Sequence, residues 1–345
     1  MLSKILPFNK TLLRKDWHIT KWFFYSYLIL LIMAVPYNVA RNLSKLNSNS
    51  YDTMNNLLYT LRRVLNLENE LVIVALIIIP VALSVALIGE EKRKKTIEIM
   101  ISGPFSRFEI FFNKIVLGIF ILVVPILISG ISLLIMRGTS DYVGMMFTSS
   151  QIMIWIFSYS AFAISMFSFS CIMGMLFGSS IGQFICTYIF GVFPIVFYEM
   201  FYLSYSSLYT LINGKEIAYE NAVRSVSKYF EMITPMQFFF RTFDYSQSAQ
   251  IFFSFRLLAV AIGMLLIALV LFDLSKMEKN SEVLTFESLE GFFRLGVFLS
   301  SILAGGIIFS EMIELGTPGL FIGYVVGGFA GYKIPLYLIK KNRAS

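Results

Sequence analysis

The sequence predicts an all-α fold, a polytopic bundle of transmembrane helices with about eight crossings, and two observations support this. First, 57% of the 345 residues are hydrophobic, only 14% are charged and the mean hydropathy is +0.75, values outside the range of soluble globular domains. Second, the hydrophobic residues gather in runs of about 20, the length that one helix needs to cross a hydrocarbon core of about 30 Å. The runs lack the alternation of strands, so we expect helices rather than a barrel.

Eight apolar runs are the expected crossings. Because their number is even, both ends of the chain lie on one side of the membrane. The loops on that side hold about twice as many Lys and Arg residues as the loops on the other side, which identifies it as the cytoplasm. The same bias explains the net charge of +7 without nucleic acid as a partner. The runs are 22–39, 71–89, 115–136, 152–177, 184–205, 251–272, 293–309 and 320–339.

The two ends of the chain have patterns of their own. Residues 1–21 combine apolar side chains with basic ones such as Arg14 and Lys15, which are available to the phosphates of membrane lipids. We expect a short helix in the membrane interface there, with a disordered basic tail as the alternative. In the last run, Gly323 and Gly327 form a G-x-x-x-G pair, which permits close helix packing within the chain or against a second copy.

The sequence offers little for bond chemistry. His18 is the only histidine, which excludes a multi-histidine metal site and leaves a Ser-His-Asp triad no place except around this residue. Cys171 and Cys186 both lie in apolar runs, where thiols behave as small hydrophobic side chains, so no disulfide is expected. The phosphate-binding sequence G-x-x-x-x-G-K-[ST] is absent. We therefore expect no catalytic residue, no metal and no bound cofactor.

Residues 90–114, EEKRKKTIEIMISGPFSRFEIFFNK, form a charged and amphipathic stretch between two apolar runs. Helix formers continue the second crossing into the cytoplasm, the apolar segment TIEIMI follows, and Ser-Gly-Pro at 102–104 breaks the chain. A second helix then starts, with Ser106 as its cap and Glu109 three residues later, as in a capping box. An apolar loop segment is costly unless it packs on lipid headgroups or on a protein partner.

This stretch resembles the coupling loop in the permease subunits of ABC-2 type exporters, the ATP-binding-cassette exporters of the second type. In that family the loop reads as an acidic-basic cluster, then Gly-Thr-Leu-Glu-Leu-Leu-Leu, a Pro, a small hydroxyl residue with Arg, and a later Lys. Lys95 stands where the family often has Gly. The matching positions are Glu91, Thr96, Ile97, Glu98, Ile99, Met100, Ile101, Pro104, Ser106, Arg107, Ile110 and Lys114.

The resemblance implies a function and a set of partners. The coupling helix would sit in a cleft of a separate cytoplasmic ATPase subunit, which binds ATP and Mg²⁺, and would pass on its closing motion. A second permease copy or a sister permease would complete the pathway for an amphipathic cargo such as a peptide, an antibiotic or a lipid. Eight-helix members of the family occur in bacterial operons linked to acetoin use or to peptide-antibiotic resistance, which implies the plasma membrane of a bacterium.

The resemblance also divides the chain into a core and two flanking segments. A type V exporter-like core of six helices would carry the coupling loop and, between its last two helices, an external region. In that region we expect a turn, an amphipathic helix that ends at Thr234, and an aromatic segment, where the family has re-entrant helices. The boundaries are 1–21 for the interfacial elbow helix, 22–273 for the core, 90–114 for the coupling loop, 206–250 for the external region, and 274–345 for a cytoplasmic linker with two additional transmembrane helices.

Two ionisable residues inside apolar runs are candidates for the pathway or for pairing between helices. Glu199 lies deeper in its run, and Arg256 lies about five residues from an end, where its side chain can reach the headgroups. Other functions remain open at this point. An ion-coupled secondary transporter and a membrane scaffold or sensor without transport are alternatives. A membrane enzyme is a third, because Glu90 and Glu91 resemble the start of an EExxxR signature, but Lys95 stands at its sixth position.

Overall fold

The computed structural model describes residues 9–45, 70–213, 222–240, 247–275, 285, 288–312 and 316–343. Within these residues the regular secondary structure is all helical, which confirms the predicted fold class. The chain forms two compact units. The first unit comprises residues 1–175 and 239–275, and the second comprises 176–238 and 276–345.

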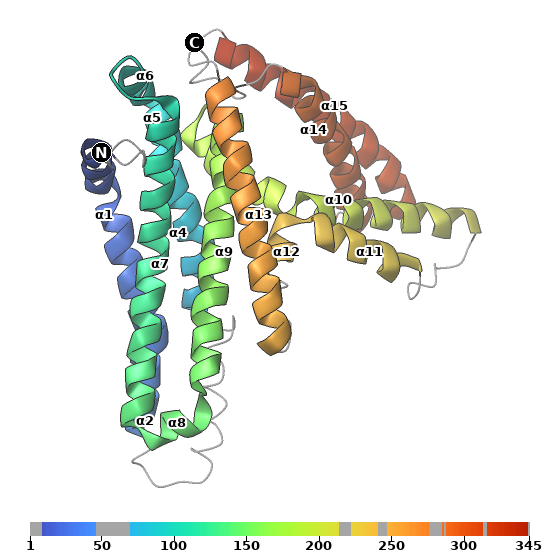
Figure 1. Ribbon diagram of the computed structural model, residues 1–345. Helices are drawn as coiled ribbons and strands as arrows, with labels where there is room; N and C mark the ends of the chain where they lie inside the picture. The colour runs from blue at the N-terminus through green and yellow to red at the C-terminus, as the bar shows by residue number, and fades with distance from the viewer. Residues whose placement is uncertain are drawn as a thin grey trace. The chain divides into compact units, whose positions relative to one another are not determined.

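The first unit holds the longer helices of the N-terminal half. In Figure 1 the helices α1, α7 and α9 run along one another, and the short α8 connects the ends of α7 and α9. Most side chains of α9 are buried, which makes it the central helix of this unit. The elements of the first unit are α1 (Lys10–Ile32), a π-helical turn (Met33–Tyr37), α2 (Asn38–Lys45), α4 (Glu70–Ser84), a second π-helical turn (Val85–Gly89), α5 (Glu90–Arg93), α6 (Thr96–Ile101), α7 (Arg107–Thr139), α8 (Asp141–Met146), α9 (Ser149–Leu176) and α13 (Gln247–Leu274).

Two glycines of α7 leave space for large side chains of α9. A Cβ atom added to Gly118 would lie 2.3 Å from the ring of Phe167, and one added to Gly130 would lie 2.3 Å from the side chain of Ile156. Neither distance is possible for real atoms, so both positions of α7 exclude a larger side chain at this spacing. The two helices therefore pack through large residues of α9 against glycines of α7.

The second unit contains a tightly packed helical hairpin. A Cβ atom on Gly323 of α15 would lie 2.1 Å from the carbonyl oxygen of Gly305, and one on Gly327 would lie 2.1 Å from that of Ser301 in α14. The G-x-x-x-G pair therefore serves packing within the chain, one of the two uses that the sequence left open. The elements of the unit are α10 (Ser180–Asn213), α11 (Ala222–Ile233), α14 (Ser288–Ile307), a π-helical turn (Ile308–Met312) and α15 (Gly316–Arg343), and α12 (Pro235–Phe240) contributes to both units.

All eight apolar runs are helical, and seven helices among the described residues are long and apolar enough to cross a membrane. The eighth expected crossing, residues 320–339, lies in α15 but is not among the seven. Side chains are described for only part of this run, so the count of about eight stays a prediction. The seven spans are Lys10–Ser44, Leu71–Arg93, Arg107–Thr139, Ser149–Leu176, Ser180–Thr210, Ala249–Leu274 and Phe293–Ser310.

Two boundaries differ from those expected. The sequence suggested a separate helix over 1–21 and a first crossing from residue 22, whereas α1 begins at Lys10 and continues unbroken to Ile32. Its early turns bury Leu12 and Asp16 against the unit, which favours one long helix over two. At the external region, α10 continues to Asn213 instead of ending near 205, because the apolar pattern persists beyond the run.

The amphipathic helix of the external region is confirmed. It is α11, which ends before Thr234, and Pro235 then occupies the first position of α12, where the missing N–H of proline costs nothing. Phe230 of α11 stacks on Tyr198 of α10, with ring centroids 4.7 Å apart. Residues 214–221 and 241–246 of this region, and most of the expected linker at 276–287, lie outside the described residues.

Candidate functional site

The loop between α4 and α7 is the candidate functional site, and a turn at Lys95 gives it its shape. The short helix α5 continues α4, and α6 starts directly after Lys95. Lys95 has φ 54° and ψ 18°, in the left-handed region that glycine favours. The family that the loop resembles often has Gly at this position, so the chain makes here the backbone turn that glycine would make more easily. The lysine carries a cost of about 1 kcal/mol for it.

The helix α6 has a buried face and an exposed face. Ile97 and Met100 are buried against the first unit, whereas Ile99 points outward with 70% of its surface exposed. The residues after the helix, Ser102, Gly103 and Pro104, are exposed as well. The loop therefore presents Ile99 at its surface, next to a turn that contains proline, and Phe108 at the start of α7 is 48% exposed as well.

The start of α7 is closed by the predicted capping box. The backbone N–H of Glu109 donates to the Ser106 hydroxyl at 3.1 Å, and the Ser106 N–H donates to the Glu109 carboxylate at 3.0 Å. Both bonds satisfy N–H groups that have no partner inside the helix. This result confirms that α7 begins where the sequence indicated, eight residues before the apolar run at 115–136.

Arg107 fixes the start of α7 to the end of α13. One guanidinium nitrogen of Arg107 donates to the carbonyl oxygens of Asp273 at 2.6 Å, Phe272 at 3.2 Å and Ser275 at 3.3 Å. A cation at the C-terminal end of a helix satisfies free carbonyls and interacts favourably with the helix dipole. Phe111 stacks on Phe272 one turn further on, with ring centroids 5.4 Å apart.

Four charged residues lie at the base of the loop, three of them buried and Lys15 partly exposed, and we call them the ionic cluster: Lys15 and Asp16 of α1, Glu91 of α5 and Lys114 of α7. The Lys114 ammonium lies 2.5 Å from the Glu91 carboxylate and 3.4 Å from both Asp16 oxygens. Lys15 donates to the other Glu91 oxygen and lies 3.4 Å from Asp16. Two cations thus face two carboxylates, so the cluster is neutral, as burial away from water requires.

Two further polar residues secure the base. Lys92 is fully buried, and its ammonium donates to the carbonyls of Gly174 at 2.8 Å and Met175 at 3.4 Å, at the end of α9. The side-chain oxygen of Asn113 accepts from the backbone N–H of Asn9 at 3.1 Å, which ties the start of α1 to α7. With Arg107 and the ionic cluster, these contacts attach the loop to α1, α7, α9 and α13.

The residues that the family resemblance assigned to coupling divide into two groups. Seven serve the chain itself. Ile97, Met100 and Ile110 are buried, Glu91 and Lys114 belong to the ionic cluster, Ser106 caps α7, and Arg107 binds the end of α13. The second group lies at the surface of the loop. Ile99 and Pro104 are exposed, and Thr96, Glu98 and Ile101 are half-buried.

Sequence reasoning missed part of this arrangement. We expected Lys15 to be available to lipid phosphates, but it binds Glu91 and lies 3.2 Å from the sulfur of Met100. Asp16 and Lys92 were not singled out. Asp16 offered one signal, since it is the only acidic residue among the basic ones of the N-terminal segment. An isolated carboxylate in such a segment indicates a partner inside the protein.

The two candidates at membrane depth lie in different units. Glu199 is half-buried on α10, and the described residues offer it no hydrogen bond or ion pair. Arg256 of α13 is exposed, with its guanidinium 5.5 Å from the ring centroid of Phe253 and 6.0 Å from that of Phe252. These contacts support a side chain that lies along its own helix. They give no information on cargo.

The described residues contain no group of three or more His, Cys, Asp and Glu side chains that could hold a metal ion. The seven apolar helices and the fold define a multi-pass helical membrane protein. Comparison with protein-family models, with curated proteins and with solved structures finds no match for the chain.

Proposed function

We propose that the chain is the permease subunit of an ATP-binding-cassette exporter and that a separate ATPase subunit drives it. The observation that carries this proposal is Ile99, an apolar side chain that is exposed on α6 between two membrane spans. Exposed apolar side chains outside the membrane favour a protein interface. The surrounding loop sequence is the one that resembles the coupling loop of ABC-2 permeases.

The base of the loop supports a mechanical role. A partner that moved α6 would push on a helix whose rear face packs through Ile97 and Met100. Behind it, the ionic cluster connects the loop to α1 and α7, and Arg107 connects it to α13. Displacement of α6 would therefore pass into the membrane helices instead of being absorbed by a soft loop.

The remaining parts of the proposal follow from what the sequence lacks and contains. The chain has no phosphate-binding loop, so ATP and Mg²⁺ belong to the partner. A second permease copy or a sister subunit completes the pathway. The 35 Phe, 18 Tyr and 17 Met residues of the chain suit an amphipathic cargo. The plasma membrane of a bacterium, with both termini in the cytoplasm, is part of the same proposal.

The test is purification of the tagged chain from its native cell in mild detergent, with assays for partner identity and ATP hydrolysis. We expect a stoichiometric subunit with a phosphate-binding loop and vanadate-sensitive activity. The variant Ile99→Asp should weaken that association by about 30-fold or more, because it places a charge at the centre of the interface. The matched control is Met145→Asp on α8, since Met145 is also an exposed apolar residue, with 85% of its surface accessible, and lies outside the loop.

Two results would contradict the proposal. The first is a chain that elutes alone and without ATPase activity even after gentle crosslinking, which would favour a scaffold or an ion-coupled transporter. The second is an Ile99→Asp variant that keeps its ATPase partner as well as Met145→Asp does, which would remove the loop from the interface.

A further inference from the structure

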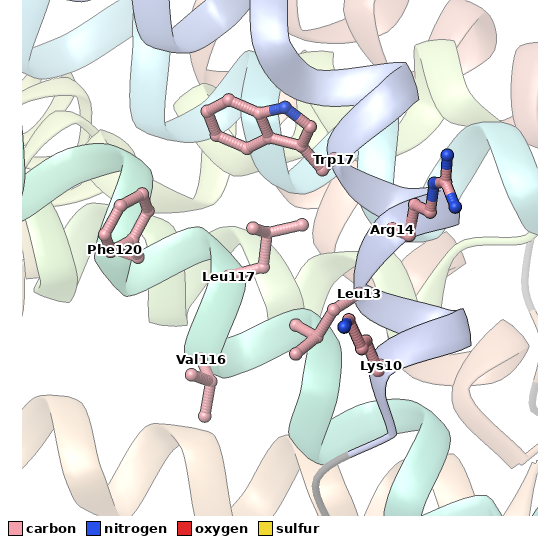
Figure 2. A pocket seen from close by; sticks show the side chains of 7 residues that line it. All are labelled: Lys10, Leu13, Arg14, Trp17, Val116, Leu117 and Phe120. Atoms are coloured by element: carbon pink, nitrogen blue, oxygen red, sulfur yellow. The ribbon is translucent and has the colours of Figure 1, made fainter.

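A groove between α1 and α7 has the chemistry of a site for one anionic phospholipid. It has a volume of about 500 Å³, within the range of about 300–1,000 Å³ that is typical of small-ligand sites. Leu13 and Trp17 of α1 and Leu117 and Phe120 of α7 form its apolar walls, and their side chains converge on the space between the two helices in Figure 2.

Two cations line the same groove. Lys10 and Arg14 are exposed and lie one turn apart on α1, so they share a face of the helix. Neither makes a hydrogen bond or an ion pair with any of the described residues. This distinguishes them from Lys15, which is turned toward the ionic cluster and paired there. The two positive charges at the groove are thus available to an anion.

The composition of the groove fits the depth at which a phospholipid changes from headgroup to hydrocarbon. Its basic residues come from the charged first turns of α1, while Leu117 and Phe120 belong to the apolar run that begins at residue 115 of α7. The ring centroids of Trp17 and Phe120 lie 6.3 Å apart. Tryptophan is enriched at the boundary between headgroups and hydrocarbon in membrane proteins. Basic pockets between transmembrane helices are a recurrent form of anionic lipid site.

We infer that this groove binds one anionic phospholipid, with its phosphate between Lys10 and Arg14 and one acyl chain against Leu13, Trp17, Leu117 and Phe120. Charge complementarity selects an anionic headgroup over a zwitterionic one, and the apolar walls select a lipid over a free anion. The inference concerns lipid recognition by the membrane helices and does not depend on an ATPase partner.

Trp17 makes the inference directly measurable, because bromine atoms on an acyl chain quench a tryptophan that they touch. The reporter protein carries Trp22→Phe, which removes a lipid-exposed tryptophan and leaves Trp17 together with the buried Trp155 as a constant background. It is reconstituted into phosphatidylcholine vesicles that contain increasing fractions of brominated phosphatidylglycerol, or of brominated phosphatidylcholine. We expect quenching to saturate at a mole fraction of brominated phosphatidylglycerol about 25-fold lower than that of brominated phosphatidylcholine. Each of the two cations contributes about fivefold to this difference in affinity.

Two control proteins complete the experiment. Lys10→Gln with Arg14→Gln should abolish the preference for phosphatidylglycerol, whereas Arg93→Gln with Lys94→Gln removes the same charge outside the groove and should keep it. A Trp17→Phe protein reports bulk lipid through Trp22 and should show no preference. Equal quenching of Trp17 by both lipids, a preference that survives in the Lys10 and Arg14 variant, or no quenching of Trp17 by either lipid would each overturn the inference.

Discussion

Replacing Lys114 with methionine should destabilise the protein strongly, because it breaks a buried charge balance. The Lys114 side chain is 3% exposed and lies 2.5 Å from Glu91 and 3.4 Å from Asp16. Methionine keeps most of the apolar stem but removes the cation. The ionic cluster then holds one cation and two carboxylates, so one negative charge is left without compensation on carboxylates that are only 3–4% exposed.

The expected magnitude follows from the burial. Breaking a buried ion pair by removing one partner costs about 3–5 kcal/mol. With an unfolding entropy of about 2.1 cal/mol/K for each residue, a chain of 345 residues loses about 4–7 °C in Tm for that free energy. Lys15→Met provides the matched control, since Lys15 is 31% exposed and water can replace part of its charge. Its loss should cost about 1 kcal/mol or less, or roughly 1 °C.

The measurement is the Tm of the detergent-solubilised protein, read from the monodisperse fraction that survives heating. The double variant Lys114→Met with Glu91→Met restores neutrality and places apolar side chains in the site. Replacement of a whole buried pair by apolar residues is often close to neutral, so the double variant should regain most of the lost Tm. The reasoning would be refuted by a Lys114→Met variant that is as stable as Lys15→Met. It would also be refuted if the double variant lost as much Tm as the Lys114→Met and Glu91→Met single variants lose together.

Two further changes test the backbone features. Lys95→Gly should raise the Tm by about 1–2 °C, because glycine adopts the left-handed conformation of Lys95 without strain, while Lys95→Ala should give no gain. Gly323→Leu should lower the Tm by several degrees, because its Cβ would lie 2.1 Å from the Gly305 carbonyl oxygen, whereas Gly296→Leu on α14 meets nothing within 4 Å and should leave the Tm unchanged. An unchanged Tm in Gly323→Leu would show that the helices of this hairpin can separate at little cost.

The sequence was sufficient for the features that depend on local chemistry. The run predicted at 152–177 is α9 (Ser149–Leu176) to within three residues, because hydrophobicity alone decides where a helix crosses a bilayer. The capping box at Ser106 was also predictable, since both of its partners lie within one turn of the chain. The turn at Lys95 was harder to predict, because a lysine gives no sign of a left-handed conformation, whereas a glycine at this position would have suggested it.

The ionic cluster could not be predicted in the same way. Glu91 and Lys15 are 76 residues apart, and Glu91 and Lys114 are 23 apart, so their pairing depends on which faces of three helices meet. Charge counting near the helix ends assigned these lysines to the cytoplasmic surface, and this rule reports only the side of the membrane. Whether a lysine then faces lipid phosphates, as proposed for Lys10, or a buried carboxylate, as observed for Lys15, is set by tertiary packing.

The division of the loop residues bears on how the proposed coupling would work. Glu91 and Lys114 lie inside the cluster, so a partner cannot touch them, yet they hold the loop to α1 and α7. Ile99 is on the surface, where a substitution changes contact with a partner and leaves the packing behind it intact. In the proposed mechanism, binding of the partner and transmission of its motion would therefore be separate properties of one short segment. If the proposed function holds, a variant of Ile99 should lose the ATPase partner while the chain stays stable. A variant of Lys114 that still folds should keep that partner but transmit its motion less well, because the connection between α6 and the membrane helices is the part that has been weakened.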